Sequence, residues 1–341
     1  MKPNSNNCFA RAKLTDDGGV ALIVVLWIFI FLFVVAFEFS TAAREEASGA
    51  HRFSDETQGY YLAVAGFERG LYDFLRQPTG GSAIQQQGQQ KTDPFDGEWR
   101  EENLGAGAFR VRLVDEGGKI NINRVNDETL RRVFTHLGID AVQRDVLVDS
   151  IMDWRDPDDL HRANGAENDY YTSLSPAYTA KNGPLDSVAE LLWIKGVARD
   201  LFFGLPEATA PAPEKARGIA LRDIFTVDSP IDRVNLRTAS PEVIHALTGI
   251  SLERCRKFAD ERKKLSEKTL GDLLPLLGIG AGDGMLQNFI FTNPSVVAVE
   301  AEGRPASSRL PRRVKGIVRL GGARGFELMR WVDRDMPLPE S

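Results

Sequence analysis

Residues 18–38 read GGVALIVVLWIFIFLFVVAFE, and this stretch decides the architecture of the chain. Its apolar part, residues 20–37, is an unbroken run of 18 hydrophobic residues that ends at Glu38. As a helix it spans about 27 Å, close to the hydrocarbon thickness of a bilayer. A helix in a soluble core needs no apolar residue on its outer side, so an apolar surface all round predicts a membrane segment. Basic residues precede the run and predict a cytoplasmic N-terminus with the rest of the chain exported: Lys2, Arg11 and Lys13.

The residues around the apolar run distinguish three kinds of N-terminal segment. A cleaved secretory signal has a shorter apolar core and small residues before the cut, whereas FEFS follows this core at residues 37–40. An uncleaved signal anchor is an alternative. However, a short polar leader ends in Gly18 and Gly19, and apolar residues begin at once with Val20. This arrangement resembles that of type IV prepilins. The resemblance implies cleavage between Gly19 and Val20 by a prepilin peptidase, with Val20 N-methylated as the first mature residue.

The fifth residue after this cleavage point is Val24, where most pilin-like subunits carry a glutamate. A carboxylate inside a membrane is costly unless it meets a partner. In pilus assembly that partner is thought to be the terminal amine of the adjoining subunit. The K-type minor pseudopilins of type II secretion systems characteristically lack the glutamate, as expected of a subunit with none stacked above it. In this respect the chain resembles the K type.

We expect the helix to continue beyond the membrane segment. Mostly apolar residues recur three and four apart, at positions 50, 53, 57, 60, 64, 67, 71 and 74. This stripe is predicted to pack on the helix's own domain, across an antiparallel sheet as in pilin-like folds. Pro78 and the pair Gly80-Gly81 are expected to stop the helix, and a glutamine-rich loop follows at residues 85–90.

Strand patterns occur in two regions far apart in sequence. Residues 98–102 and 109–115 flank a turn at 104–107, and three C-terminal strands are predicted at 296–302, 313–320 and 326–332. We therefore predict an α+β fold, with a pilin-like long N-terminal helix on an antiparallel sheet and a large inserted all-helical domain. The predicted divisions are a leader at 1–19, a transmembrane segment at 20–38, a pilin-like part at 39–116, the insertion at 117–290 and the C-terminal strands at 291–341.

The predicted insertion contains an internal repeat. Residues 120–128, ININRVNDE, align with residues 234–242, VNLRTASPE, and each copy places an asparagine before a helix cap and an acidic first turn. Residues 188–197, VAELLWIKGV, align with residues 270–279, LGDLLPLLGI. The insertion is thus predicted to consist of two repeats that are similar to SAM-like or helix-hairpin-helix units.

Helix-hairpin-helix units raise an alternative function, a membrane-anchored DNA-binding protein of a competence or DNA-uptake system. Such units bind DNA by aiming the backbone N–H groups of a hairpin at phosphate. Six lysines and arginines at residues 254–264 would supply charge in the second copy. The first copy instead places Asp140, Asp145 and Asp149 after its hairpin, where they would repel phosphate. We therefore expect no nucleic-acid partner.

Acidic residues are crowded in two neighbouring segments, DWRDPDD at residues 153–159 and GAENDYY at 165–171. Crowded carboxylates repel one another unless a cation lies between them, and Ca²⁺ takes six to eight oxygen ligands. The spacing is not that of an EF-hand, so a solvated acidic loop remains an alternative. K-type pseudopilins carry a comparable stretch and bind calcium in their helical domain. This resemblance implies a structural Ca²⁺ with the ligands Asp153, Asp156, Asp158, Glu167 and Asp169, and Asp159 in reserve.

Composition and motifs give no sign of an enzyme. The chain has 341 residues, 43% of them hydrophobic, and a net charge of −6, which does not suggest a general nucleic-acid binder. Of its two cysteines Cys8 lies in the expected leader, so the mature chain would hold one thiol. The four histidines fall in separate predicted elements, and no hydrolase or phosphate-loop motif occurs.

The features above make the chain similar, over nearly its whole length, to K-type minor pseudopilins. The segment DEGGKININ at residues 115–123 adds to the leader and the acidic loop in this resemblance. The resemblance implies a non-enzymatic subunit at the tip of the type II secretion pseudopilus, held in the inner membrane with its globular part in the periplasm. It also implies partners: the I-type and J-type minor pseudopilins, the other pseudopilins of the fibre and the prepilin peptidase.

Overall fold

The computed structural model describes residues 17–76, 95, 97–204, 218–263, 270–280, 282–308, 310–321 and 325–333. The glutamine-rich loop predicted at residues 85–90 and most of the leader lie outside these ranges. The chain divides into two compact units, residues 1–57 and 58–341.

The first unit is the N-terminal portion of one long helix, α1 (Asp17–Leu75). Its apolar side chains are exposed on every side, for example Phe31 at 66% and Phe33 at 71%. Among the described residues this is the one helix that is long and apolar enough to cross a membrane. An apolar surface with no protein around it matches the predicted membrane segment.

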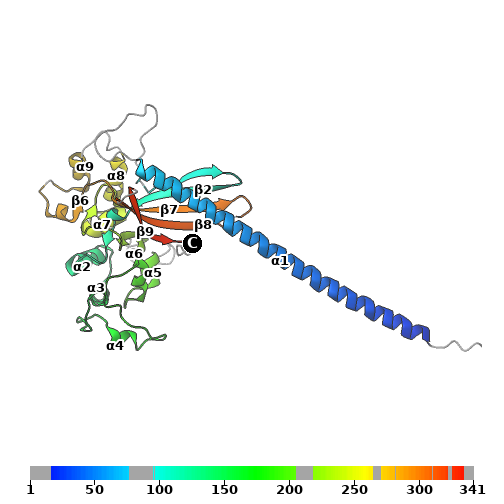
Figure 1. Cartoon of the computed structure of the whole chain (residues 1–341). Coiled ribbons are helices and arrows are strands. Elements are labelled where there is room, and N and C mark those ends of the chain that lie inside the picture. The colour runs from blue at the N-terminus through cyan, green and yellow to red at the C-terminus, as the bar shows by residue number, and fades with distance from the viewer. Residues whose placement is uncertain are drawn as a thin grey trace, which may run out of the picture. The chain divides into compact units, whose positions relative to one another are not determined.

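The second unit contains the end of α1 and a five-stranded antiparallel sheet in the order β1-β2-β7-β8-β9. Figure 1 shows α1 lying across these strands. The strands are β1 (Arg100–Leu104), β2 (Gly107–Asp115), β7 (Val296–Pro305), β8 (Arg312–Leu320) and β9 (Phe326–Val332). The pilin-like core is therefore one helix on one sheet, as predicted.

The helix approaches the sheet closely because glycines on α1 leave room for the side chains of the strands. Phe67, Leu71 and Phe74 of α1 are buried against the sheet, in the periodic positions that the sequence predicts. A Cβ atom at Gly70 would lie 2.7 Å from a methyl group of Val111, so a larger residue does not fit without displacement. Earlier on the predicted stripe, Phe53 is 73% exposed, so that part of the packing prediction is wrong.

Between β2 and β7 the chain forms a mainly helical region with its own hydrophobic core. Its helices are α2 (Asp127–His136), α3 (Ala141–Arg155), α4 (Asn168–Tyr171), α5 (Arg199–Phe203), α6 (Leu221–Ile224), α7 (Pro241–Thr248), α8 (Leu252–Arg262) and α9 (Leu270–Leu277). The described residues of this region also contain the 3-10 helices η1 (Glu116–Gly118), η2 (Val188–Trp193) and η3 (Gly284–Asn288).

Four two-residue strands join this region into two parallel pairs, which the sequence patterns missed. The first pair is β3 (Ile120–Asn121) with β4 (Phe225–Thr226), and the second is β5 (Val234–Asn235) with β6 (Phe289–Ile290). Each strand is too short to show a periodic pattern in the sequence. Since both pairs involve the two aligned segments, they give the region two parts of similar construction.

Equivalent side chains make equivalent contacts in the two parts. Asn121 donates to the carbonyl of Ser229 at 2.7 Å, and Asn235 donates to that of Thr292 at 2.9 Å. The two asparagines occupy the same place in the aligned segments. Each of these matched hydrogen bonds closes a loop onto a parallel strand pair, so the two aligned segments make the same local contact, and the wider repeat stays a prediction.

A second pair of equivalent contacts comes from an arginine at the end of α3 in the first part and at the end of α8 in the second. Arg155, at the end of α3, donates to the carbonyls of Ile122 and Val125 at 2.5 and 3.1 Å. Arg262, at the end of α8, donates in the same manner to two carbonyls at 2.7 and 2.9 Å, those of Leu236 and Ala239. Each guanidinium thus satisfies carbonyl groups of the segment that leads into the first helix of its copy.

Candidate functional site

The predicted processing site lies at the start of α1, which begins at Asp17. Gly19 and Val20 are therefore both helical in the uncleaved chain, and Val20 is 64% exposed. Val24, one turn further, is 51% exposed and presents no carboxylate to the surroundings. Cleavage and methylation at this bond stay predictions.

The acidic loop folds around Asp153, which stands on the last turn of α3 and is completely buried. The backbone N–H groups of Arg162 and Ala166 donate to its carboxylate at 3.1 and 3.0 Å, and the Arg162 guanidinium lies 3.4 Å away. A Cβ atom at Gly165 would collide with the same carboxylate, so the glycine allows the loop to close over it. The pKa of Asp153 is nevertheless raised by its burial and by the charge of Asp156.

Glu167 is the side chain in this loop whose charge lacks compensation. It is 2% exposed, and neither of its carboxylate oxygens has a hydrogen-bond partner in the structure. Burial raises its pKa to about 7, and the neighbouring charges of Asp153 and Asp156 add to the effect. One oxygen of Asp156 is also buried without a partner. A buried, unpaired carboxylate is strongly unfavourable unless a cation is bound beside it.

These orphaned oxygens fit the donor set of a hard cation, and they separate the predicted ligands into two groups. Asp153 and Glu167 are buried and Asp156 is half-buried, and the charges of Asp153 and Asp156, followed by those of Asp159 and Asp158, add to the raised pKa of Glu167. Asp158 and Asp169 accept the backbone N–H groups of Leu160 and Tyr170, and Asp159 accepts from two asparagine side chains. In the described residues no three acidic, histidine or cysteine side chains already converge as a metal cluster. Among the predicted ligands, the oxygens that a cation would best satisfy are therefore those of Glu167 and the unpartnered oxygen of Asp156, with Asp153 beside them.

The end of β2 carries a polar joint that the sequence analysis did not identify. Asp115 is 4% exposed and accepts three hydrogen bonds, from the Gly117 N–H at 2.8 Å, Asn235 Nδ2 at 2.8 Å and Thr238 Oγ1 at 2.6 Å. Asn235 and Thr238 belong to the second helical repeat. Burial raises the pKa of Asp115 despite these donors. The last residue of β2 is thus tied directly to that repeat.

The next residue, Glu116, is tied to the first repeat. It is buried, accepts the hydroxyl of Thr226 at 2.5 Å, and lies 3.1 Å from Lys119 Nζ and 3.8 Å from Lys315 Nζ. Burial opposes ionisation of Glu116, but the charges of Lys119 and Lys315 outweigh it and lower the pKa. Two adjacent acidic residues therefore fix both helical repeats to the sheet. In the sequence, the only sign of this joint is the pair Asp115-Glu116 followed by two glycines.

The hairpin between α2 and α3 lacks the free backbone N–H groups of a phosphate-binding site. The carboxylate of Asp140 accepts the backbone N–H groups of Val142 and Gln143 at the start of α3, where a phosphate would have to bind. Arg254 of the second repeat donates to the carbonyl of Leu276 at 3.1 Å. The DNA-binding alternative therefore gains no support from the geometry.

Comparison with known proteins agrees with the fold and with the helical insertion. Residues 111–209 match the family model described as type II secretion system (T2SS), protein K. A relative from Pseudomonas aeruginosa, the type II secretion system protein K, is 28% identical over 268 residues, which is 72% of each chain. The chain is therefore similar to type II secretion system protein K, in the matched region and over most of its length. Residues 111–209 contain Asp115, Glu116 and the acidic loop, whereas the partners of the joint on the second repeat, Asn235 and Thr238, lie beyond the matched region.

Other proteins named type II secretion system protein K match over different shares of their length. The putative type II secretion system protein K of Escherichia coli K12 is 26% identical over 64% of this chain and 69% of its own. The match to the protein K of Pectobacterium carotovorum, at 25% identity, covers only 36% of this chain and 39% of that relative. The sequence identities to these relatives are low, so the similarity lies mainly in the fold.

A solved structure has the same architecture. It is a chain of the GspK-GspI-GspJ complex from the type 2 secretion system of enterotoxigenic Escherichia coli, which matches with a TM-score of 0.56 at 14% sequence identity. The match covers 86% of this chain and the whole of that chain. The combination of a long helix, an antiparallel sheet and a helical region is therefore found in a solved protein.

Proposed function

We propose that this chain is the K-type minor pseudopilin of a type II secretion system and forms the end subunit of its pseudopilus. The observation that carries the proposal is the placement of a large helical region between β2 and β7 of a pilin-like core. The known complex of GspK with GspI and GspJ suggests I-type and J-type minor pseudopilins as the partners of this chain. The role is non-enzymatic: the subunit begins or caps a fibre that supports protein export across the outer membrane.

The position of the subunit at the end of the fibre agrees with the end of the sheet to which the insertion is attached. α1 enters the second unit beside Gly59, which approaches Arg312 and Pro305 at one end of the sheet. The insertion leaves from Asp115 and returns at Val296, at the opposite end. A bulky domain on that end would prevent another subunit from stacking there. The absence of a glutamate at Val24 agrees with the same position, because no subunit above would need it.

The proposed location is the inner membrane, with the second unit in the periplasm. The basic residues before the apolar run support a cytoplasmic N-terminus, and α1 supplies one membrane anchor. Mass spectrometry of the native N-terminus tests this directly. We expect a methylated Val20 in cells with an active prepilin peptidase and an unprocessed chain without it. A mature N-terminus beyond residue 37 would rule out a retained anchor.

Function is tested by deletion and co-purification. Deleting the gene is expected to stop secretion of exoproteins and to leave DNA uptake unchanged, and the full chain should co-purify with other minor pseudopilins. Loss of DNA uptake with normal secretion would instead support the DNA-binding alternative.

A structural calcium ion is part of the proposal. Asp153, Asp156 and Glu167 would hold it, and the ion would compensate the buried charges of the acidic loop. The folded-state pKa of Glu167 lies above the unfolded value, so in EDTA its contribution to stability is lost as the pH rises from about 4.5 to about 7. With calcium bound, the charged form is stabilised and this loss should disappear.

The variant Glu167→Gln separates a calcium site from a solvated acidic loop. In EDTA at neutral pH it should be more stable than the wild type by about 2 kcal/mol, because a buried charge has been removed. Calcium should raise the melting temperature of the wild type but not of the variant, and calorimetry should show binding only to the wild type. Glu128→Gln, an exposed change on α2, is the matched control. If the wild type binds no calcium and EDTA leaves its melting temperature unchanged, the site does not exist.

A further inference from the structure

Arg162, which lies between the two acidic segments, has its guanidinium beside one of the proposed calcium ligands. Its backbone N–H donates to the carboxylate of Asp153 at 3.1 Å. Its side chain reaches the same carboxylate, with Nε 3.4 Å from Oδ1 of Asp153. The Asp153 side chain is completely buried, whereas 43% of the Arg162 side chain is exposed. Arg162 therefore meets the buried carboxylate while much of its side chain stays in contact with solvent.

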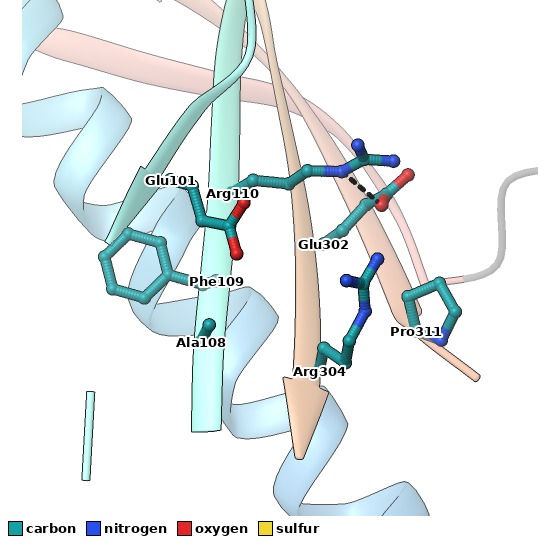
Figure 2. Close-up of a pocket in the computed structure, with 7 residues that line it drawn as sticks. All are labelled: Glu101, Ala108, Phe109, Arg110, Glu302, Arg304 and Pro311. Atoms are coloured by element: carbon teal, nitrogen blue, oxygen red, sulfur yellow. Dashed lines mark hydrogen bonds and ion pairs between the residues drawn. The ribbon is translucent and has the colours of Figure 1, made fainter. Parts of the chain in front are cut away.

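This ion pair is long when it is compared with a similar pair on the sheet. In Figure 2 the dashed line joins Arg110 to Glu302, another arginine with a buried carboxylate, and the distance between Arg110 Nε and Glu302 Oε2 is 2.6 Å. Charge-assisted hydrogen bonds between nitrogen and oxygen are usually about 2.7–2.9 Å long. At 3.4 Å the guanidinium of Arg162 compensates part of the charge of Asp153 without being bound tightly to it.

The charge of Arg162 acts on a second proposed ligand but does not satisfy the third. Burial and the charge of Asp158 raise the pKa of Asp156, and the charge of Arg162 partly offsets them. Glu167 accepts no hydrogen bond from the guanidinium, because neither of its oxygens has a partner in the structure. One positive charge thus compensates Asp153 and Asp156 in part and leaves the buried Glu167 unpaired.

The other basic side chains around the loop are engaged elsewhere. Arg155 donates to two backbone carbonyls of the segment that leads into α2. Lys195 donates to a carbonyl of the loop at 2.9 Å, and Lys181 forms ion pairs of 2.6 and 2.8 Å with two acids outside the proposed ligand set. Of these four basic residues, Arg162 is the one that is paired with a proposed ligand.

We propose that Arg162 competes with calcium for the carboxylate of Asp153 and thereby weakens calcium binding at the acidic loop. The inference rests on the calcium site proposed above. A divalent cation beside Asp153, Asp156 and Glu167 would compensate all three charges and would repel the guanidinium. Arg162 can give up its contact at little cost, because the contact is long and the side chain is already half in solvent. Arg162 thus sets the calcium concentration at which the site fills.

Competition differs from a purely structural role of Arg162 in the sign of its effects. A structural ion pair stabilises the loop by the same amount with and without calcium. A competing guanidinium stabilises the loop when calcium is absent and opposes the binding of calcium. A side-chain substitution tests the guanidinium alone, because the backbone N–H of residue 162 donates to Asp153 whatever the side chain is.

The test is calorimetry with calcium chloride on the full chain in detergent, at an ionic strength of about 0.1 M. Arg162→Gln should bind calcium about tenfold more tightly than the wild type, because a positive charge beside the ion has been removed. A higher salt concentration should narrow the difference, since the Arg162 side chain is partly exposed and its charge is screened. Arg162→Lys keeps the charge and should bind with nearly the wild-type affinity.

Arg144→Gln is the matched control. Arg144 lies 2.9 Å from Asp145, so it too is an arginine paired with an aspartate of α3. Positions 144 and 153 of this helix are about 14 Å apart along its axis. This separation exceeds the Debye length of about 10 Å at 0.1 M ionic strength, so the variant should leave the calcium affinity unchanged.

Melting temperatures give a second measurement, which a structural role would change differently. In EDTA, Arg162→Gln should melt below the wild type, because Asp153 has lost part of its compensation. Calcium should raise the melting temperature of Arg162→Gln by more than it raises that of the wild type, since tighter binding stabilises the folded chain more. An equal difference between the two proteins with and without calcium would show that Arg162 is an ordinary structural ion pair and would refute competition.

The outcomes separate this inference from the site on which it rests. If neither the wild type nor Arg162→Gln binds calcium, the proposed calcium site does not exist and the inference fails with it. If both bind with the same affinity, the site exists and the competition alone is refuted. A gain in affinity for Arg144→Gln as large as that for Arg162→Gln also refutes it, because the effect would then come from the net charge of the chain. Tighter binding by Arg162→Gln, with Arg162→Lys close to the wild type, would establish the competition.

Discussion

Replacing Asp115 by alanine tests whether the polar joint holds the second helical repeat to the sheet. The change removes the acceptor of three hydrogen bonds, from Gly117, Asn235 and Thr238. Hydrogen bonds to a charged acceptor contribute about 1.5–3 kcal/mol each, so their loss alone would cost at least about 4.5 kcal/mol. Removing a buried carboxylate whose pKa is raised recovers part of this. We therefore expect a net loss of about 3 kcal/mol.

The measurement is urea unfolding of the full chain in detergent, followed by tryptophan fluorescence. Asp115→Asn retains one acceptor oxygen and should lose about 1–2 kcal/mol. Hydrogen exchange should show faster opening of the backbone around Asn235 and α7 in both variants. Asp127→Ala, an exposed acid in the first turn of α2, is the control and should cost about 0.5 kcal/mol. If Asp115→Ala lowers the free energy of unfolding no more than Asp127→Ala does, the joint does not stabilise the protein and the reasoning is wrong.

Three further predictions concern the sheet and the repeats. Burial disfavours ionisation of Glu300, yet Lys315 and other cations lower its pKa to about 2. Between about pH 4.5 and about pH 2 the unfolded chain therefore binds more protons than the folded chain, and the free energy of unfolding should fall as the pH drops through this range. Urea titrations of Glu300→Gln should lack this part of the acid sensitivity. Gly70→Ala should lower the melting temperature. The added methyl group would lie 2.7 Å from Val111 and cost about 1–3 kcal/mol, which outweighs a gain of about 1 kcal/mol in helix propensity. An unchanged melting temperature would contradict the close packing. Arg155→Ala and Arg262→Ala should each cost about 2 kcal/mol in chemical unfolding, since each leaves two carbonyls without their donor, and a large effect of one alone would show that the repeats are not equivalent.

The anchor and the pilin-like core could be predicted because their patterns are local. The apolar run and the alternation in residues 109–115 require no knowledge of distant contacts. The first strand was predicted at residues 98–102 but is found at Arg100–Leu104. The turn needs only Gly105 and Ala106, with Gly105 at a positive φ of 56°, so the strands extend further than the glycine-rich segment suggested.

The candidate site was predictable in part. The crowded acidic segment indicated where a cation site would be, but only the fold separates the buried Glu167 from Asp169, which accepts a backbone N–H. The joint could not be predicted. Asp115 meets Asn235 across 120 positions, and Glu116 meets Thr226 across 110. No periodic pattern carries information about such pairings, since they depend on how the two repeats pack.

The attachment of the helical region has an evolutionary and practical consequence. Its two ends lie on adjacent antiparallel strands, with Asp115 paired to Val297 in the register. Excision of everything between Asp115 and Val296, with a short turn in its place, would convert β2 and β7 into an ordinary hairpin and leave the other strands where they are. The pairing of β2 with β7 thus does not depend on the length of the chain between them, because the two ends of the inserted region are already neighbours in the register.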